Sequence, residues 1–347
     1  MREIERRGGP GGTRSEAQAE EHAHPFPGAR IGVVIPCYRV AKQIERVVAG
    51  IPAWVETILC VEDKSPDDTL AVLDALRDPR VRVLRREHNG GVGAAMQTGF
   101  EEARRLGLDI VVKMDGDDQM DPAYLPQLVA PLYHGRADMT KGNRWADGRA
   151  LRQMPLVRIV GNTGLTFLVK FASGHWGLFD PANGYLALRT DVLGLLRKRL
   201  PDRYFFESGL LIELGIQRAL VLDVAIPARY GDEHSSLSIT RTLLGFPPRL
   251  LHGFLRRIAW RYFLYDFGAV SVFLLLGLPL LLIGAAFGCV LWYTMDAQGS
   301  YASSGQVMLA AMPIILGFQM LVQAIVLDIH NAPKVALCGD LGPRTPD

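Results

Sequence analysis

The chain has 347 residues, of which 49% are apolar and 21% charged, with 38 basic and 36 acidic side chains. This composition excludes a disordered chain, a collagen-like fibre and a small disulfide-stabilised domain, and the length indicates a catalytic-size domain with a further segment. A formal net charge of +2 gives no basic field of the kind that binds nucleic acid. The four cysteines are widely spaced and form no CxxC pair, which argues against a zinc site and a disulfide framework.

Residues 1–29 are rich in glycine and charged side chains, which predicts a disordered N-terminal tail. From residue 31, short apolar runs alternate with helical stretches, a pattern typical of an α/β domain with a mainly parallel sheet. We predict strands over 31–38, 55–63, 81–86 and 109–115. We predict helices over 42–49, from Ser65 to Arg77, and from the Asn89-Gly90-Gly91 turn to Leu106. The domain is expected to cover residues 30–238 and to bind ligands at the carboxyl ends of its strands.

Two long stretches near the end of the chain carry no charged residue, one from Phe267 to Met295 and one from Ala297 to Leu327. Each exceeds the roughly 20 apolar residues that cross about 30 Å of hydrocarbon, so residues 267–330 are predicted to form a transmembrane helical hairpin. Two buried helices of a soluble domain are the alternative. Residues 239–266 mix leucine and aromatic side chains with arginine, which predicts amphipathic juxtamembrane helices; a plain linking helix is the alternative.

The basic residues near the two spans predict their orientation. The loop between the spans carries neither lysine nor arginine, whereas basic side chains flank both outer ends: Arg249, Arg256, Arg257, Arg261 and Lys334. The positive-inside rule therefore predicts an integral membrane protein whose large domain, both termini and 331–347 tail are cytoplasmic.

An acidic turn follows directly on the apolar strand predicted over 109–115. Asp115, Asp117 and Gln119 place oxygen ligands around one turn, as Mg²⁺ and Mn²⁺ prefer. Such an ion would neutralise a diphosphate leaving group. An acidic loop that is merely solvated is the alternative. Asp121 is predicted to be the N-cap of a helix that opens at Pro122.

Further motifs run in one order along residues 31–240. They are Val34-Ile35-Pro36-x-Tyr38, Val61-Glu62-Asp63-Lys64-Ser65-Pro66-Asp67-Asp68-Thr69, Asn89-Gly90-Gly91-x-Gly93, Met114-Asp115-Gly116-Asp117-x-Gln119-x-Asp121-Pro122, Gly142-Asn143-Arg144, Arg158-x-x-x-Asn162, and Asp180-Pro181 with Gly184-Tyr185. In these motifs the chain resembles the family 2 glycosyltransferases. Within that family it is similar to the polyprenyl-phosphate (dolichyl-phosphate mannosyltransferase-like) sugar transferases, some of which also have two C-terminal transmembrane helices.

The resemblance implies a GT-A type, Rossmann-like fold and an inverting, metal-dependent transfer of a sugar. It implies that Pro36, Tyr38 and Asp63 line the nucleotide base pocket. Asp115, Asp117 and Gln119 would hold the metal and the diphosphate. Arg144 and Arg158 would grip phosphate oxygens, Asp180 would lie on the acceptor side, and Glu207 would flank the sugar. The glycine segment from Asn89 is either a plain turn or a phosphate cradle.

The partners implied are a nucleotide sugar (UDP- or GDP-linked), a polyprenyl phosphate and the lipid bilayer, with Mg²⁺ or Mn²⁺ as cofactor. A homo-oligomer is compatible with the sequence. An acceptor phosphate is already anionic at neutral pH, because its second pKa is about 6. The transfer therefore requires no strong general base. A processive polysaccharide synthase of the same fold and a non-catalytic membrane scaffold are the alternative functions.

Overall fold

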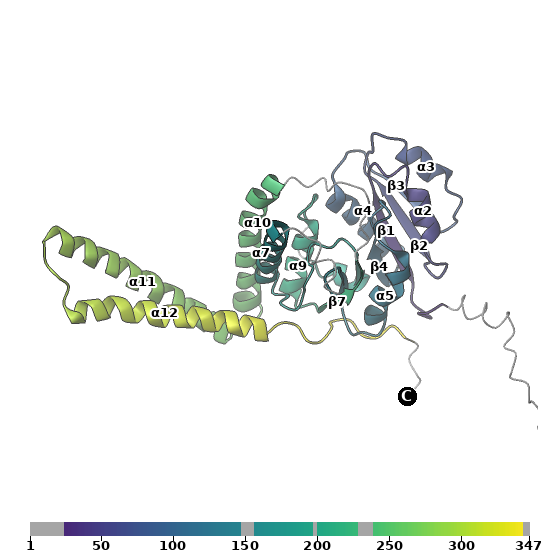
Figure 1. Cartoon of the computed structure of the whole chain (residues 1–347). Coiled ribbons are helices and arrows are strands. Elements are labelled where there is room, and N and C mark those ends of the chain that lie inside the picture. The colour runs from purple at the N-terminus through teal and green to yellow at the C-terminus, as the bar shows by residue number, and fades with distance from the viewer. Residues whose placement is uncertain (1–23, 147–155, 197–199, 228–238, 343–347) are drawn as a thin grey trace, which may run out of the picture.

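The structure is a computed structural model and describes residues 24–146, 156–196, 200–227 and 239–342. Its centre is a seven-stranded sheet with the order β3-β2-β1-β4-β6-β5-β7 (Figure 1). The strands are β1 (Ile31–Cys37), β2 (Thr57–Glu62), β3 (Val81–Arg85), β4 (Ile110–Lys113), β5 (Met139–Asn143), β6 (Leu186–Arg189) and β7 (Val221–Ala225). Four strand pairs are parallel, and β6 runs antiparallel to both β4 and β5. The predicted α/β class with a mainly parallel sheet is confirmed.

Helices cover both faces of this sheet. The helices of the domain are α2 (Ile44–Gly50), α3 (Thr69–Ala75), α4 (Val92–Arg105), the 3-10 turn η1 (Pro122–Tyr124) with α5 (Leu125–Tyr133), α7 (Leu156–Ser173), α8 (Thr190–Leu193), α9 (Phe206–Gln217) and α10 (Ile239–Ala259). Of these, α7 and α10 form a further layer that packs on α9 (Figure 1). Side chains of β1 alternate between the two cores, as the period of a strand requires. Val34 packs with α4 and α9 on one face, whereas Val33 and Ile35 pack with α2 and α5 on the other.

The predicted strands 31–38, 55–63, 81–86 and 109–115 agree with β1 to β4 within two residues at each end. The helix predicted from Ser65 begins instead at Thr69. The reason is a local network: Asp67 accepts hydrogen bonds from the hydroxyls of both Ser65 (2.5 Å) and Thr69 (2.7 Å). These bonds close residues 65–68 into a turn before the helix can start.

The C-terminal hairpin consists of α11 (Ala269–Ala297) and α12 (Ser304–His330), which project away from the sheet domain (Figure 1). Both helices are long and apolar enough to cross a membrane, and most of each apolar stretch is not buried in the protein. Glycines let the two helices approach closely: a Cβ on Gly317 would lie 2.5 Å from the backbone nitrogen of Leu281. The predicted hairpin is confirmed, and its exposed apolar surface disfavours the alternative of two buried core helices.

A buried ion pair ties this hairpin to the sheet domain. Arg257 of α10 is fully buried, and its guanidinium lies 2.7 and 3.0 Å from the two carboxylate oxygens of Asp328 on α12. The same guanidinium donates to two backbone carbonyls at the C-terminal end of α7, each at 3.0 Å. Tyr262, in the π-helical turn η2 (Trp260–Leu264), and Trp176 also donate to Asp328. Three segments therefore meet at one carboxylate: α12, the continuous α10–η2 stretch, and the loop that carries Trp176.

The segments at the two ends of the described chain also pack on the domain. After α12 the chain returns along the domain towards α5 (Figure 1). The backbone amides of Leu337 and Cys338 donate to the buried carboxylate of Asp138, at 2.8 and 2.9 Å. Of the tail predicted over 1–29, residues 1–23 lie outside the described residues. Phe26 is buried, with its ring 5.5 Å from that of Trp54.

We expect Asp328→Ala to lower the free energy of unfolding of the detergent-solubilised protein by about 3–5 kcal/mol, because it leaves the buried Arg257 guanidinium without its counter-charge. Thermal unfolding followed by circular dichroism measures this. Asp296→Ala is the matched control, since Asp296 is exposed at the end of α11. Equal shifts in the two variants would contradict the proposed importance of the ion pair.

Candidate active site

The residues predicted to bind the nucleotide base lie together at the carboxyl ends of two neighbouring strands. Pro36 is paired with Val61 in the parallel register of β1 and β2. Tyr38 follows β1 with 43% of its surface exposed, and Asp63 follows β2 and is only 2% exposed. The backbone amide of Asp63 donates to the carbonyl of Cys37 at 3.1 Å, which brings the two strand ends together.

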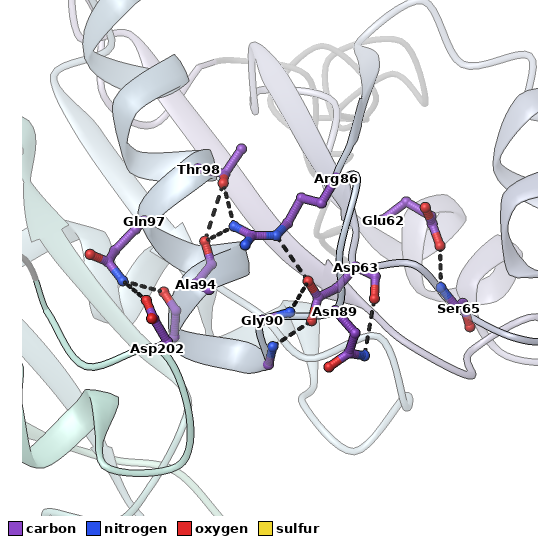
Figure 2. Close-up of polar contacts among 12 residues, drawn as sticks. Glu62, Asp63, Ser65, Arg86, Asn89, Gly90, Ala94, Gln97, Thr98 and Asp202 are labelled. Atoms are coloured by element: carbon purple, nitrogen blue, oxygen red, sulfur yellow. Dashed lines mark hydrogen bonds and ion pairs between the residues drawn. The ribbon is translucent and has the colours of Figure 1, made fainter.

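The carboxylate of Asp63 has an internal function that the sequence did not predict (Figure 2). Its Oδ1 accepts the backbone N–H of Gly90 at 3.0 Å, and its Oδ2 accepts that of Gly91 at 2.7 Å. Arg86 completes the pairing, with Nε 2.9 Å from Oδ1. The two glycine amides are therefore occupied by Asp63, which favours the turn interpretation of this segment over the phosphate cradle. Contact of Asp63 with a base stays a prediction.

The glycines are required for this turn. Gly91 has φ +84°, a conformation that L side chains rarely adopt. A Cβ on Gly93 would lie 2.0 Å from the carbonyl oxygen of Pro201. The backbone amide of Ala94 donates to the carbonyl of Asp202 at 2.8 Å, so the first turn of α4 is docked directly on the loop before α9.

The predicted metal ligands lie on a tight turn after β4. The Asp115 side chain is 33% exposed, Asp117 is partly exposed, and Gln119 is exposed. The backbone amide of Gln119 donates to Asp117 Oδ1 at 3.1 Å, and Asp118 has a positive φ and pairs with Arg46 on the surface. Together these interactions hold the turn that presents Asp115 and Asp117.

The structure confirms the predicted N-cap at the end of this turn. Asp121 Oδ1 accepts the backbone N–H of Ala123 at 3.0 Å, and Pro122 opens the 3-10 turn η1. This cap ends the acidic turn and starts the helical segment that continues into α5.

A buried lysine that the sequence analysis did not single out connects two of the predicted motifs with Glu207. Lys113 ends β4 and is 1% exposed. Its Nζ lies 2.6 Å from Asp115 Oδ1, 3.2 Å from the carbonyl of Gly184 and 3.6 Å from Glu207 Oε1 in the first turn of α9. Burial would lower the pKa of Lys113, but the carboxylates of Asp115 and Glu207 raise it above its ordinary value.

Two further predicted residues form a bidentate ion pair. Arg144 follows β5, and its Nε and Nη2 lie 2.7 and 3.0 Å from the two carboxylate oxygens of Asp180. Asp180 is buried, whereas Arg144 is partly exposed. The structure thus brings together a residue predicted to grip phosphate and the residue predicted on the acceptor side.

Lys141 connects this ion pair to the acidic turn. It is fully buried in β5, and its ammonium donates to the carbonyl of Asn183. Burial lowers the pKa of Lys141 to about 8, opposed by the charges of Glu207 and Asp180. The positive charges of Lys113 and Arg144 also lower the pKa of Lys141. The groups around Lys113 and those around Asp180 are therefore one electrostatic cluster.

Lys113 could have been found from the sequence, whereas Lys141 could not. Lys141 lies in the mainly polar segment MTKGN, but Lys113 ends the short apolar run IVVK, where both faces of the strand are covered and a continuous apolar run is the rule. A lysine at such a position is rarely buried unless it is paired. Arg158 lies at the start of α7, and its side chain is outside the described part of the structure.

The oxygen donors after β4 fit a magnesium or manganese ion. Carboxylate and amide oxygens are the ligands that these ions prefer, and Asp115 keeps part of its surface accessible. Within the described ranges no group of three His, Cys, Asp or Glu side chains is placed to hold a metal. Phosphate oxygens and water would therefore have to complete the coordination, as is usual for Mg²⁺.

Comparison with known proteins gives three results. The family profile described as Glycosyl transferase family 2 matches residues 32–195. The UDP-N-acetylglucosamine–dolichyl-phosphate N-acetylglucosaminyltransferase of Methanococcus voltae is 28% identical over 62% of this chain and 92% of its own length. The polyprenol monophosphomannose synthase of Mycolicibacterium smegmatis is 34% identical over 52% of this chain and 70% of its own.

We expect Asp63→Asn to lower the free energy of unfolding by about 1–3 kcal/mol, because the asparagine NH2 group is only a donor and would face one of the two backbone N–H donors without accepting from it. Urea denaturation measures the change. Asp74→Asn is the control, since Asp74 also pairs with an arginine but on the surface. A loss no larger than the control's would contradict the structural function of Asp63.

The lowered pKa of Lys141 predicts a pH-dependent stability. Between about pH 8 and the ordinary value of 10.5, the unfolded lysine binds a proton that the folded lysine has lost. The free energy of unfolding, relative to Lys141→Met, should therefore rise with pH by up to about 1.4 kcal/mol per pH unit. Urea denaturation across this range measures it, with Lys42→Met at an exposed lysine as control. Parallel curves for wild type and Lys141→Met would refute the prediction.

Proposed function

Because the chain belongs to glycosyl transferase family 2 and is a glycosyltransferase, we propose that it transfers one sugar from a nucleotide sugar to a membrane polyprenyl phosphate. One observation carries the proposal: the residues predicted for the diphosphate and for the acceptor form one cluster in a domain that is tied to an apolar helical hairpin. The names of both relatives describe a sugar on a lipid phosphate, which supports single transfer over processive polysaccharide synthesis.

On the donor side, Asp115, Asp117 and Gln119 would hold Mg²⁺ or Mn²⁺. When bound, the ion would stabilise negative charge on the departing diphosphate. Pro36 and Tyr38 would contact the base, since they lie at the neighbouring strand end. The Lys113 contacts keep Asp115 in one orientation beside Glu207, which would flank the sugar.

On the acceptor side, Arg144 and Arg158 would bind the lipid phosphate. Both oxygens of Asp180 are engaged by Arg144, so Asp180 would orient the guanidinium towards the phosphate. The acceptor phosphate is anionic at neutral pH and can attack the anomeric carbon directly, with inversion. Alignment of the two substrates, rather than a general base, would then supply most of the rate enhancement.

The membrane arrangement follows from the same proposal. Residues 30–238 would form the catalytic domain on the cytoplasmic side, residues 239–266 would lie at the headgroups, and residues 267–330 would cross the bilayer. The basic residues at the outer ends of the hairpin support this orientation. Two of them, Arg257 and Arg261, are buried in the protein and therefore also have a structural function.

The test is a transfer assay with the full chain in detergent. Undecaprenyl or dolichyl phosphate is combined with a panel of labelled UDP- and GDP-sugars and Mg²⁺ or Mn²⁺, and lipid-linked sugar is detected by mass spectrometry. We expect transfer with one donor, no transfer to the dephosphorylated polyprenol, and a loss of about 100-fold or more in Asp117→Asn.

Asp118→Asn is the matched control, because Asp118 is the adjacent carboxylate and pairs with Arg46 on the surface. It should retain transfer close to wild type. Transfer that persists in Asp117→Asn with a chelator present would remove the metal from the mechanism, and a wild-type protein inactive with every donor would remove the proposed function.

A further inference from the structure

We infer that Lys113 is a resident cation of the donor site, which makes binding of a divalent ion depend on the donor diphosphate. Its ammonium holds an oxygen of Asp115 that a free ion would otherwise take. This inference rests on the proposed function, because it assumes that Asp115 belongs to the metal and diphosphate site.

The position of Lys113 is defined by contacts on three sides. Its Nζ lies 2.6 Å from Asp115, 3.2 Å from the carbonyl of Gly184 and 3.6 Å from Glu207. Lys113 is almost completely buried, and Glu207 is mostly buried as well. Since an ammonium at such a place is stable only when it is paired, this cation belongs to the ligand-free protein.

Gly184 is adapted to this contact. A Cβ at this position would lie 2.6 Å from Lys113 Nζ and 2.9 Å from Asp115 Oδ2. A larger residue here would have to displace the Lys113 ammonium or the Asp115 carboxylate, so the glycine leaves room for the ion pair. The Lys113–Asp115 pair is local in the chain, but its surroundings are not, because Gly184 and Glu207 come from two distant segments.

The consequence for a divalent ion is electrostatic. A buried positive charge that contacts Asp115 repels a second cation at the same carboxylate, and this repulsion is screened little by solvent. Glu207, 3.6 Å from Lys113 Nζ, offsets part of this charge, but the described residues contain no group of three His, Cys, Asp or Glu side chains placed to hold a metal ion. A bound diphosphate places negative charge beside both the Lys113 ammonium and the divalent ion, and so offsets the repulsion between them. The ion should then bind firmly only with the nucleotide.

The test is direct measurement of Mn²⁺ binding to the full chain in detergent by electron paramagnetic resonance, with and without UDP or GDP. The wild-type protein should bind Mn²⁺ weakly alone and at least about tenfold more tightly with nucleotide. Lys113→Met should tighten binding of Mn²⁺ alone by about tenfold or more. Lys113→Gln, which keeps a donor for the Gly184 carbonyl, should do the same, whereas Lys113→Arg should resemble wild type.

Lys334→Met removes the same charge at an exposed lysine after α12 and should leave Mn²⁺ binding unchanged. Unchanged or weaker Mn²⁺ binding in folded Lys113→Met and Lys113→Gln would overturn the inference. Lys113 would then have only a structural function. Equally tight binding to the wild type with and without nucleotide would overturn it even if both variants failed to fold. The measurement uses neither sugar nor acceptor, so it is independent of the transfer assay.

Discussion

A charge buried at the end of a β-strand is stable only when an opposite charge lies within hydrogen-bonding distance, and this constraint organises the site. Lys113 is held by Asp115 and Glu207, and Asp180 by Arg144. Asp115 lies only two residues after Lys113, but the Lys113–Glu207 and Arg144–Asp180 pairs join segments that are distant in the chain. These two pairs therefore also influence how α9 and the loop before β6 pack on the sheet. Asp63 does the same for the glycine turn. The chemistry of the site and its folding therefore depend on the same carboxylates.

The same constraint explains how the hairpin is attached. α11 and α12 expose apolar surface that a bilayer can cover, but apolar helices alone would not fix a domain relative to the membrane. Asp328 supplies this fixation, because its carboxylate is charged near the end of an apolar helix and must be neutralised by Arg257. Arg257 in turn binds the C-terminal end of α7, the helix whose first turn contains Arg158. A continuous path of contacts thus runs from the hairpin to a helix of the proposed acceptor side.

The sequence predicts local features of this protein better than non-local ones. Apolar runs and turn residues located β1 to β4, α4 and the hairpin, because burial and backbone preference act on neighbouring residues. The antiparallel insertion of β6 between β4 and β5 was not predicted, since strand order depends on contacts far apart in the chain. For the site, residue type and motif brought out Asp115, Asp180 and Glu207. Which cation pairs with which carboxylate could not be predicted, because the pairing of Lys113 with Asp115 and Glu207, and of Arg144 with Asp180, depends on the folded geometry.

The charges of the cluster explain why two anionic substrates need a further cation. Lys113, Lys141 and Arg144 are basic, and Asp115, Asp180 and Glu207 are acidic, so the cluster is close to neutral at pH 7. A nucleotide diphosphate and a lipid phosphate each bring negative charge, and a phosphate monoester alone carries about −1.5 to −2. A neutral site offers little net attraction to both at once, and Asp117 adds a further negative charge. A divalent ion that arrives with the diphosphate would restore the balance at the point where charge develops during transfer.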